Sequence, residues 1–251
     1  MYSVDTIKRV RMLAMALGLF MTYIFVMYGL YLITKDSVIS AFISDIFMIL
    51  LGGSYIIFRN KGFPKNYKYD KRFFFFVVVA ILILWFLSQI VATYMISNGA
   101  IFDDVLKYVN KHPVLYIVMA ILIAPICEEI LMRGIVFHEL YHQFSRFSAY
   151  FISSVVFGIM HGTVVQVVLG ILCGILFAFI YEYTHKLRYS IYAHIGFNLL
   201  SIMLAMHEIP IIEEYANPTG IAFVGVVLAI FLAVMGNLFQ SRLPYGNDIL
   251  S

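Results

Sequence analysis

The sequence predicts an all-α fold class: a polytopic bundle of about eight transmembrane helices with both termini in the cytoplasm. Apolar residues make up 63% of the chain, charged residues only 12%, and the mean hydropathy is +0.93. The charged residues are bunched between long apolar runs, which is typical of a polytopic membrane protein and not of a buried soluble core. The composition therefore excludes an ordinary soluble domain. The net charge of +3 is small and gives no reason to expect a nucleic-acid partner.

Each helical span needs about 20 mainly apolar residues to cross the hydrocarbon core. Eight runs approach this length, at residues 12–34, 38–58, 73–96, 114–140, 147–161, 164–183, 190–206 and 221–239. The fifth run is short, so we expect it to be tilted or to end inside the bundle, against protein or water. The first run is too long for a signal peptide and no small-residue cleavage site follows it, so we expect a retained span.

Lysine and arginine orient the spans, because short cytoplasmic loops carry an excess of both. One set of loops is strongly basic and holds Lys8, Arg9, Arg11, Arg59, Lys61, Lys65, Lys68, Lys71, Arg72, Arg146, Lys186, Arg188 and Arg242. The opposite loops mix Lys35, Lys107 and Lys111 with Asp36, Asp103, Asp104, Glu208, Glu213 and Glu214. Both termini are therefore predicted to be cytoplasmic, with the basic 59–72 loop against anionic lipid headgroups.

A single membrane domain, residues 1–251, is the simplest organisation. The chain shows no internal repeat, low-complexity tract or long polar segment that could fold outside the membrane. Cys127 and Cys173 both lie in apolar runs without ligand-like spacing, so we expect no disulfide framework.

Ionisable residues inside spans are costly, at about 2.5 to 3.5 kcal/mol each at helix centre, and so mark functional sites. The fourth run contains adjacent carboxylates, Glu128 and Glu129, followed by Arg133. Glu129 and Arg133 are four residues apart and can pair on one helical face. Glu128 is rotated by about 100° around the helix axis from Glu129, so we expect it to face a polar site built by other spans.

Two further spans carry polar groups that could meet Glu128. His161 ends the fifth run, and the seventh run places His194 and Asn198 four residues apart on one face. A buried carboxylate beside a histidine can take a proton from water, and a second histidine with an asparagine can stabilise an oxyanion. This set is typical of hydrolysis of an amide bond. Asp45, isolated in the second run, is interpreted as an interhelical or pore-facing group.

These motifs, Glu-Glu-x-x-x-Arg, Phe-x-x-x-His and His-x-x-x-Asn in this order, resemble the CAAX prenyl protease type 2 family, also called CPBP or Abi. The similar segment covers residues 113–206, with Pro125 before the glutamates and Gly134 after Arg133. The resemblance implies an intramembrane endopeptidase in which Glu128 and His161 activate water, and His194 and Asn198 form the oxyanion site. Glu129 and Arg133 would support the site.

The resemblance also implies that no cofactor or metal is required, with zinc held by Glu128, His161 and His194 as the alternative. It suggests a bacterial member in the cell membrane. The expected partners are the lipid bilayer and a membrane-associated peptide or protein substrate, such as a pheromone, a bacteriocin leader or a CAAX-like peptide.

A competing motif is His138-Glu139-Leu140-Tyr141-His142, a literal HExxH. In zinc metallopeptidases both histidines of this motif bind the metal and the glutamate is the base. Here the motif falls at the predicted cytoplasmic end of the fourth run, without an evident third ligand, and the plainer interpretation is a polar helix end at the interface.

Two other classes of function remain open from the sequence. One is a non-catalytic immunity or scaffold protein, which would have no need of a complete Glu128, His161, His194 and Asn198 set. The other is a proton-coupled transporter, which the lack of inverted repeats and of matched broken helices disfavours.

Overall fold

The computed structural model describes residues 4–59, 70–99, 111–161, 164–204 and 209–239. Within these ranges every element is helical. Three long helices come first, α1 (Val4–Thr34), α2 (Ser37–Arg59) and α3 (Lys71–Ser97). The last part of the chain forms α8 (Arg146–Ile159), α9 (Val164–Thr184), α10 (Leu187–Leu204), α11 (Pro210–Tyr215) and α12 (Pro218–Phe239). The predicted all-α class is confirmed.

The fourth predicted span is a composite helix with two π-helical stretches. It is built from α5 (Pro113–Val118), η1 (Met119–Ile123), α6 (Ala124–Glu129), η2 (Ile130–Phe137) and α7 (His138–Gln143). Pro125 stands in the first turn of α6 and cannot donate a backbone hydrogen bond, which is one cause of the irregular ladder before it. Insertions of π-helix are frequent at functional sites, and here they flank the two glutamates.

Six described helical segments are long and apolar enough to cross a membrane: Val10–Thr34, Ser37–Arg59, Lys71–Ser97, Pro113–Gln143, Gln166–Thr184 and Pro218–Phe239. The protein is thus an integral multi-pass membrane protein. The other two predicted spans correspond to α8, which has 14 residues, and to α10, which has 18 residues. Arg188, His194 and Asn198 lower the hydropathy of α10.

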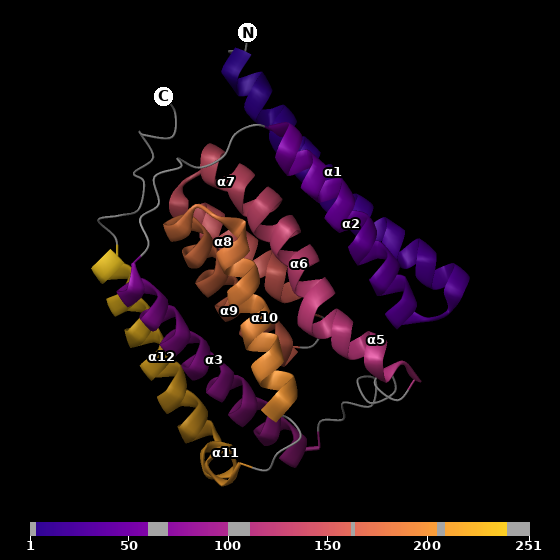
Figure 1. Ribbon diagram of the computed structural model, residues 1–251. Coiled ribbons are helices and arrows are strands. Elements are labelled where there is room, and N and C mark those ends of the chain that lie inside the picture. The colour runs from indigo at the N-terminus through magenta and orange to yellow at the C-terminus, as the bar shows by residue number, and fades with distance from the viewer. Residues whose placement is uncertain (1–3, 60–69, 100–110, 162–163, 205–208, 240–251) are drawn as a thin grey trace.

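The described residues from which the orientation is predicted lie at two opposite ends of the bundle. The turn between α1 and α2, the start of α5 and α11 are at one end, and the starts of α3 and α8 are at the other (Figure 1). Several of the charged residues used to predict the orientation lie outside the described residues: Lys61, Lys65, Lys68, Asp103, Asp104, Lys107, Glu208 and Arg242, together with the side chains of Lys8 and Arg9.

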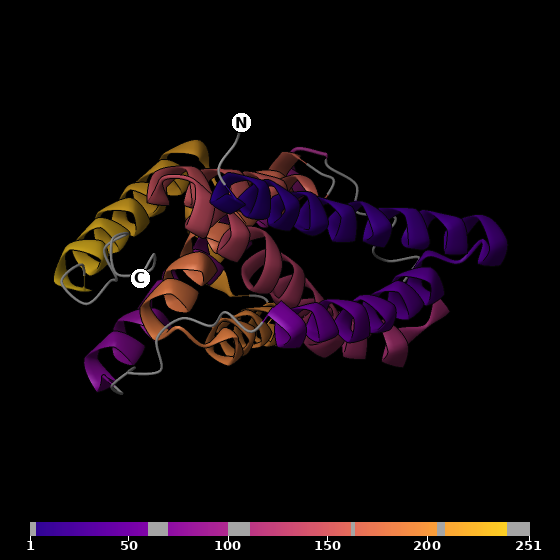
Figure 2. The same ribbon diagram turned by 90° about the horizontal axis from the view of Figure 1, so that it is seen from above.

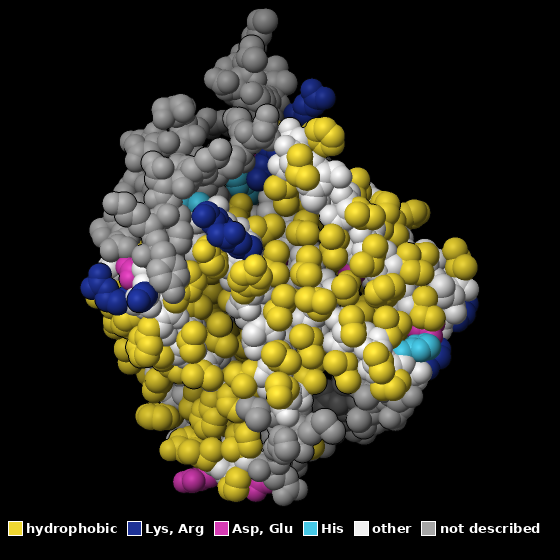
Figure 3. Space-filling view, in the orientation of Figure 1, with side chains coloured by type: hydrophobic (Ala, Val, Ile, Leu, Met, Phe, Trp, Pro, Cys, Tyr) yellow, Lys and Arg dark blue, Asp and Glu magenta, His cyan; other side chains and the backbone are white. Residues whose placement is uncertain are grey.

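The composite helix is contacted by α1, α2, α8, α9 and α10. The α1–α2 pair packs on one side of it and the α3–α12 pair lies on the far side of α9 and α10 (Figures 1 and 2). Much of α1 is exposed, with Phe25 78% accessible, as suits a lipid-facing helix. Hydrophobic side chains cover most of the face in Figure 3.

At the α1–α2 turn, Asp36 caps α2 by accepting hydrogen bonds from the backbone N–H groups of Val38 (3.0 Å) and Ile39 (3.1 Å). Its other carboxylate oxygen pairs with Lys111 Nζ at 2.5 Å and with His112 Nε2 at 2.9 Å. The hydrogen bonds from Lys111 and His112 hold the pKa of this carboxyl well below its usual range. This cluster ties the turn to the start of the composite helix.

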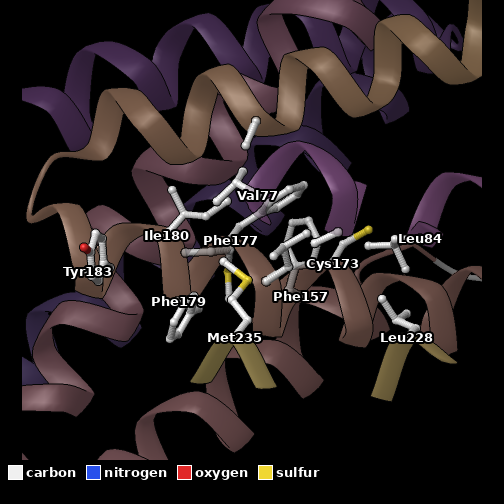
Figure 4. Close-up of a cluster of buried hydrophobic side chains, with 14 of the residues drawn as sticks. Val77, Leu84, Phe157, Cys173, Phe177, Phe179, Ile180, Tyr183, Leu228 and Met235 are labelled. Atoms are coloured by element: carbon white, nitrogen blue, oxygen red, sulfur yellow. The ribbon is translucent and has the colours of Figure 1, made fainter. Parts of the chain in front are cut away.

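Aromatic and sulfur side chains fill the core between α3, α8, α9 and α12. Figure 4 shows Phe157, Phe177 and Cys173 together with Leu228 and Met235 from α12. Phe73 and Tyr183 stack with ring centroids 3.7 Å apart. Because hydrocarbon tails are as apolar as these side chains, close packing and not burial from water holds the helices together.

Among the described helices, α8 and α9 make the most extensive contact. Gly170 and Gly174 of α9 form a Gly-x-x-x-Gly pattern of the kind that lets membrane helices approach closely. A Cβ on Gly174 would lie 2.8 Å from Ser154 Cα, and one on Gly170 would lie 2.9 Å from Gly158 Cα. These contacts set the position of the end of α8, where His161 follows.

Gly174→Val is therefore expected to lower the free energy of unfolding by about 1 to 3 kcal/mol or more, because the backbones of α8 and α9 would have to separate. Thermal unfolding in detergent measures the effect. Gly53→Val on α2 is the matched control, because a Cβ there meets nothing within 4 Å. Equal losses in both variants would refute the packing argument.

Candidate active site

The two glutamates of α6 face different surroundings. Glu129 is fully buried, whereas the Glu128 side chain is 21% accessible. Glu129 Oε1 lies 3.0 Å from Arg133 Nη1, the pair expected from their spacing of four residues. This predicted pair is confirmed.

Arg133 is almost completely buried, at 2% accessibility, and is surrounded by partners suited to a guanidinium. Its Nη2 donates to the carbonyl oxygen of Gly174 at 3.1 Å. The guanidinium carbon lies 4.4 Å from the ring centroid of Phe157 and 5.4 Å from that of Phe177, within the range of cation–π attraction. Arg133 therefore joins the composite helix to both α8 and α9.

His194 reaches this pair from α10. Its Nδ1 is 3.1 Å from Glu129 Oε1, and its ring stacks on Phe177 with centroids 4.7 Å apart. A carboxylate on Nδ1 orients the imidazole and directs Nε2 toward Glu128, whose Oε2 is 3.8 Å away. Sequence reasoning missed this contact between Glu129 and His194, because the two residues lie on different helices.

His161 stands just beyond the end of α8. Its backbone N–H donates to the carbonyl of Gly158 at 3.0 Å, and its Nδ1 lies 2.8 Å from the carbonyl oxygen of Phe157. A carbonyl oxygen only accepts, so Nδ1 carries the hydrogen. Nε2 of the neutral ring then holds a lone pair, and it lies 4.0 Å from Glu128 Oε2.

The structure thus brings Glu128, His161 and His194 together, with both imidazole Nε2 atoms facing one carboxylate oxygen. Glu128 Oε2 is buried and has no hydrogen-bond partner among the described protein groups. Such an atom in a native protein calls for a specific explanation, and a water or ligand is one.

Asn198 is placed differently from the other three. Its Nδ2 donates to the carbonyl oxygen of Ala120 in η1 at 2.8 Å, which ties α10 to the composite helix two turns before Glu128. The amide group has two hydrogens, and this bond uses one of them. The predicted oxyanion role of Asn198 would require the other.

Asp45 bridges α1 and α2 by accepting a hydrogen bond from Tyr23 Oη at 2.8 Å. The carboxylate is 3% accessible, and the Cys127 thiol contacts it. This contact fits the interpretation of Asp45 as an interhelical group.

The HExxH residues form a separate, buried network. Glu139 is fully buried, and its Oε1 accepts from Tyr55 Oη at 3.1 Å and from Arg59 Nη1 at 3.2 Å. His138 Nδ1 lies 3.3 Å from Tyr181 Oη, and the His138 and His142 rings are 4.3 Å apart. A carboxylate already paired with a guanidinium fits poorly as the base of a zinc peptidase, and the network ties α2 and α9 to α7.

Neither proposed zinc set has the geometry of a ready metal site, because the described residues include no group of three or more His, Cys, Asp or Glu side chains arranged to hold an ion. The donor types of Glu128, His161 and His194 do suit zinc. Both histidines also have Nδ1 held by an acceptor, as metal-ligating histidines usually do.

Residues 110–200 match the family model described as Type II CAAX prenyl endopeptidase Rce1-like. The matched segment contains Glu128, Glu129, Arg133, His161, His194 and Asn198. The searches of curated proteins and of solved structures give no significant match. Residues 110–200 of this multi-pass membrane protein therefore form a domain of the Rce1-like type II CAAX prenyl endopeptidase family, a family of intramembrane proteases.

Proposed function

We propose that this protease is an intramembrane endopeptidase that cleaves a membrane-associated peptide or protein with a water molecule activated by Glu128 and His161. One observation carries the proposal. The buried Oε2 of Glu128 faces His161 Nε2 at 4.0 Å and His194 Nε2 at 3.8 Å. A water molecule bridging such atoms would donate one hydrogen to Glu128 and the other to the His161 lone pair.

In the reaction, Glu128 takes a proton from this water molecule while the water oxygen adds to the scissile carbonyl carbon. The proton then passes from Glu128 to the leaving amine as the C–N bond breaks. His161 orients the water, because the Phe157 carbonyl fixes its tautomer. A base or acid in this role contributes about 10² to 10⁴ in rate.

His194 and Asn198 would stabilise the oxyanion in the transition state. For donation from His194 Nε2 the imidazole must carry both protons, and Glu129, which lies 3.1 Å from Nδ1, would pair with that imidazolium. The second amide hydrogen of Asn198 would be the other donor. Removing one such donor in proteases costs about 10² to 10³ in kcat.

The finer topology belongs to the same proposal. In addition to the six long segments, α8 and α10 are counted as two shorter spans that lie inside the bundle. The chain then has eight spans, and both termini are cytoplasmic. The Glu128 and His161 side chains are 21% and 30% accessible, so a peptide can reach them from the bundle surface. Suitable substrates are a peptide pheromone, a bacteriocin leader or a CAAX-like sequence in a bacterial cell membrane.

The alternative mechanism places zinc on Glu128, His161 and His194, where the donor types fit. Bound zinc would supply a Lewis acid and a water of lowered pKa. The protein residues would hold the ion through Nε2 of each histidine, while Phe157 and Glu129 fix the two rings.

The test is cleavage of lipid-embedded peptides, with and without a CAAX sequence, by the purified wild type, Glu128→Gln and Glu139→Gln, each with and without a chelator. We expect cleavage to be lost in Glu128→Gln alone and to survive chelation. Loss with the chelator but rescue by added zinc would support the zinc mechanism. Loss in Glu139→Gln, at a matched folded fraction, would move the site to His138 and His142.

A further inference from the structure

An apolar groove of about 670 Å³ runs between α3 and α10, on the surface of the bundle. Its lining includes Val77 and Ile81 from α3, and Ala193, Gly196 and Met203 from α10. The volume falls within the range of small-molecule sites. The hollow depends on the small side chains of α10, since a Cβ on Gly196 would meet nothing within 4 Å.

The groove lies on the opposite side of α10 from the active site. Its α10 residues recur every three or four positions, from Tyr189 to Met203. At 100° per residue, His194 and Asn198 point about 160° away from the centre of this stripe. A substrate chain lying in the groove would therefore be separated from Glu128 by the body of α10.

One end of the groove is cationic. The rings of Phe74 and Tyr189 are 5.2 Å apart there, so the first turns of α3 and α10 lie side by side. Arg72 and Arg188, at the starts of these two helices, are both exposed. Arg188 lies over the Tyr189 ring, with 5.0 Å between the guanidinium carbon and the centroid, and Arg72 Nε is 3.8 Å from Asp70.

We propose that this groove binds an anionic phospholipid, with one acyl chain between α3 and α10 and its phosphate at Arg72 and Arg188. The lining from Tyr189 to Met203 covers about 21 Å of helix, more than one leaflet of a hydrocarbon core about 30 Å thick. Arginines recognise phosphate well, because the guanidinium presents paired donors. The bound lipid supports α10 from the face opposite His194.

The experiment compares the delipidated wild type with Gly196→Leu and Gly225→Leu. Leucine at position 196 fills the groove, whereas a Cβ on Gly225 of α12 also meets nothing within 4 Å but lies outside the lining. Both changes favour the helix, so neither is expected to unfold the protein. Each variant is mixed with phosphatidylglycerol or with phosphatidylcholine, and retained lipid is measured by native mass spectrometry and Tm by thermal unfolding.

For the wild type and Gly225→Leu we expect retained phosphatidylglycerol and a rise in Tm of about 3 to 5 °C at ten times the Kd. Gly196→Leu should lose both effects. Combined replacement of Arg72 and Arg188 by Gln should abolish the preference over phosphatidylcholine without removing chain binding.

Equal retention by Gly196→Leu would overturn the proposal, as would equal stabilisation of the wild type by both lipids. A prenylated peptide that displaces the lipid from the wild type, and is cleaved with a raised KM by Gly196→Leu, would assign the groove to the substrate chain instead. The lipid readouts need no catalysis, so they stand or fall separately from the proposed mechanism.

Discussion

Glu128→Gln is expected to reduce peptide cleavage by about 10³-fold, within the range for loss of a general base, while leaving the protein as stable as the wild type or more so. The glutamine side chain has nearly the same shape but cannot accept the proton of water. Glu128 Oε2 has no hydrogen-bond partner among the described protein groups. The change to an amide of the same shape therefore breaks no hydrogen bond with the described protein groups, and functional residues are often replaced without loss of stability.

Initial cleavage rates and Tm, measured on the same preparation, check both halves of this prediction. The control is Glu139→Gln, which weakens a buried contact with Arg59 at 3.2 Å. That variant should lose stability but keep its cleavage rate per folded molecule. Unchanged cleavage by Glu128→Gln would remove Glu128 from the mechanism.

Arg133→Met is expected to lower the free energy of unfolding by about 3 to 5 kcal/mol, because it leaves the fully buried Glu129 without its guanidinium partner. It also removes the contacts with the Phe157 and Phe177 rings. Such a loss corresponds to a fall in Tm of about 6 to 20 °C for a chain of this size. Thermal unfolding in a fixed detergent measures it, with the exposed Arg11→Met as the control.

The double variant Glu129→Leu/Arg133→Met separates folding from chemistry. With both charges replaced by apolar side chains of similar volume, most of the stability should return. Cleavage should stay low, because His194 Nδ1 loses the carboxylate 3.1 Å away that orients it. Full recovery of cleavage by the double variant would show that Glu129 has only a structural role. An unchanged Tm in the single variant Arg133→Met would show that the buried ion pair does not hold the helices together.

The sequence by itself determined the membrane character, the helical class and the pair of Glu129 with Arg133. These follow from local rules: run length sets the spans, and a spacing of four residues brings two side chains onto one face. The three polar motifs could also be found from sequence, because ionisable groups stand out in apolar runs.

Only the tertiary structure decided which polar groups meet. The contact of His194 with Glu129, and the bond of Asn198 to the Ala120 carbonyl, depend on how α10 is rotated and inclined against α6 and η1. Helical periodicity fixes faces within one helix and is silent about rotation between helices. The π-helical stretches at Met119–Ile123 and Ile130–Phe137 also change the turn angle on either side of Glu128, so extrapolating 100° per residue fails there.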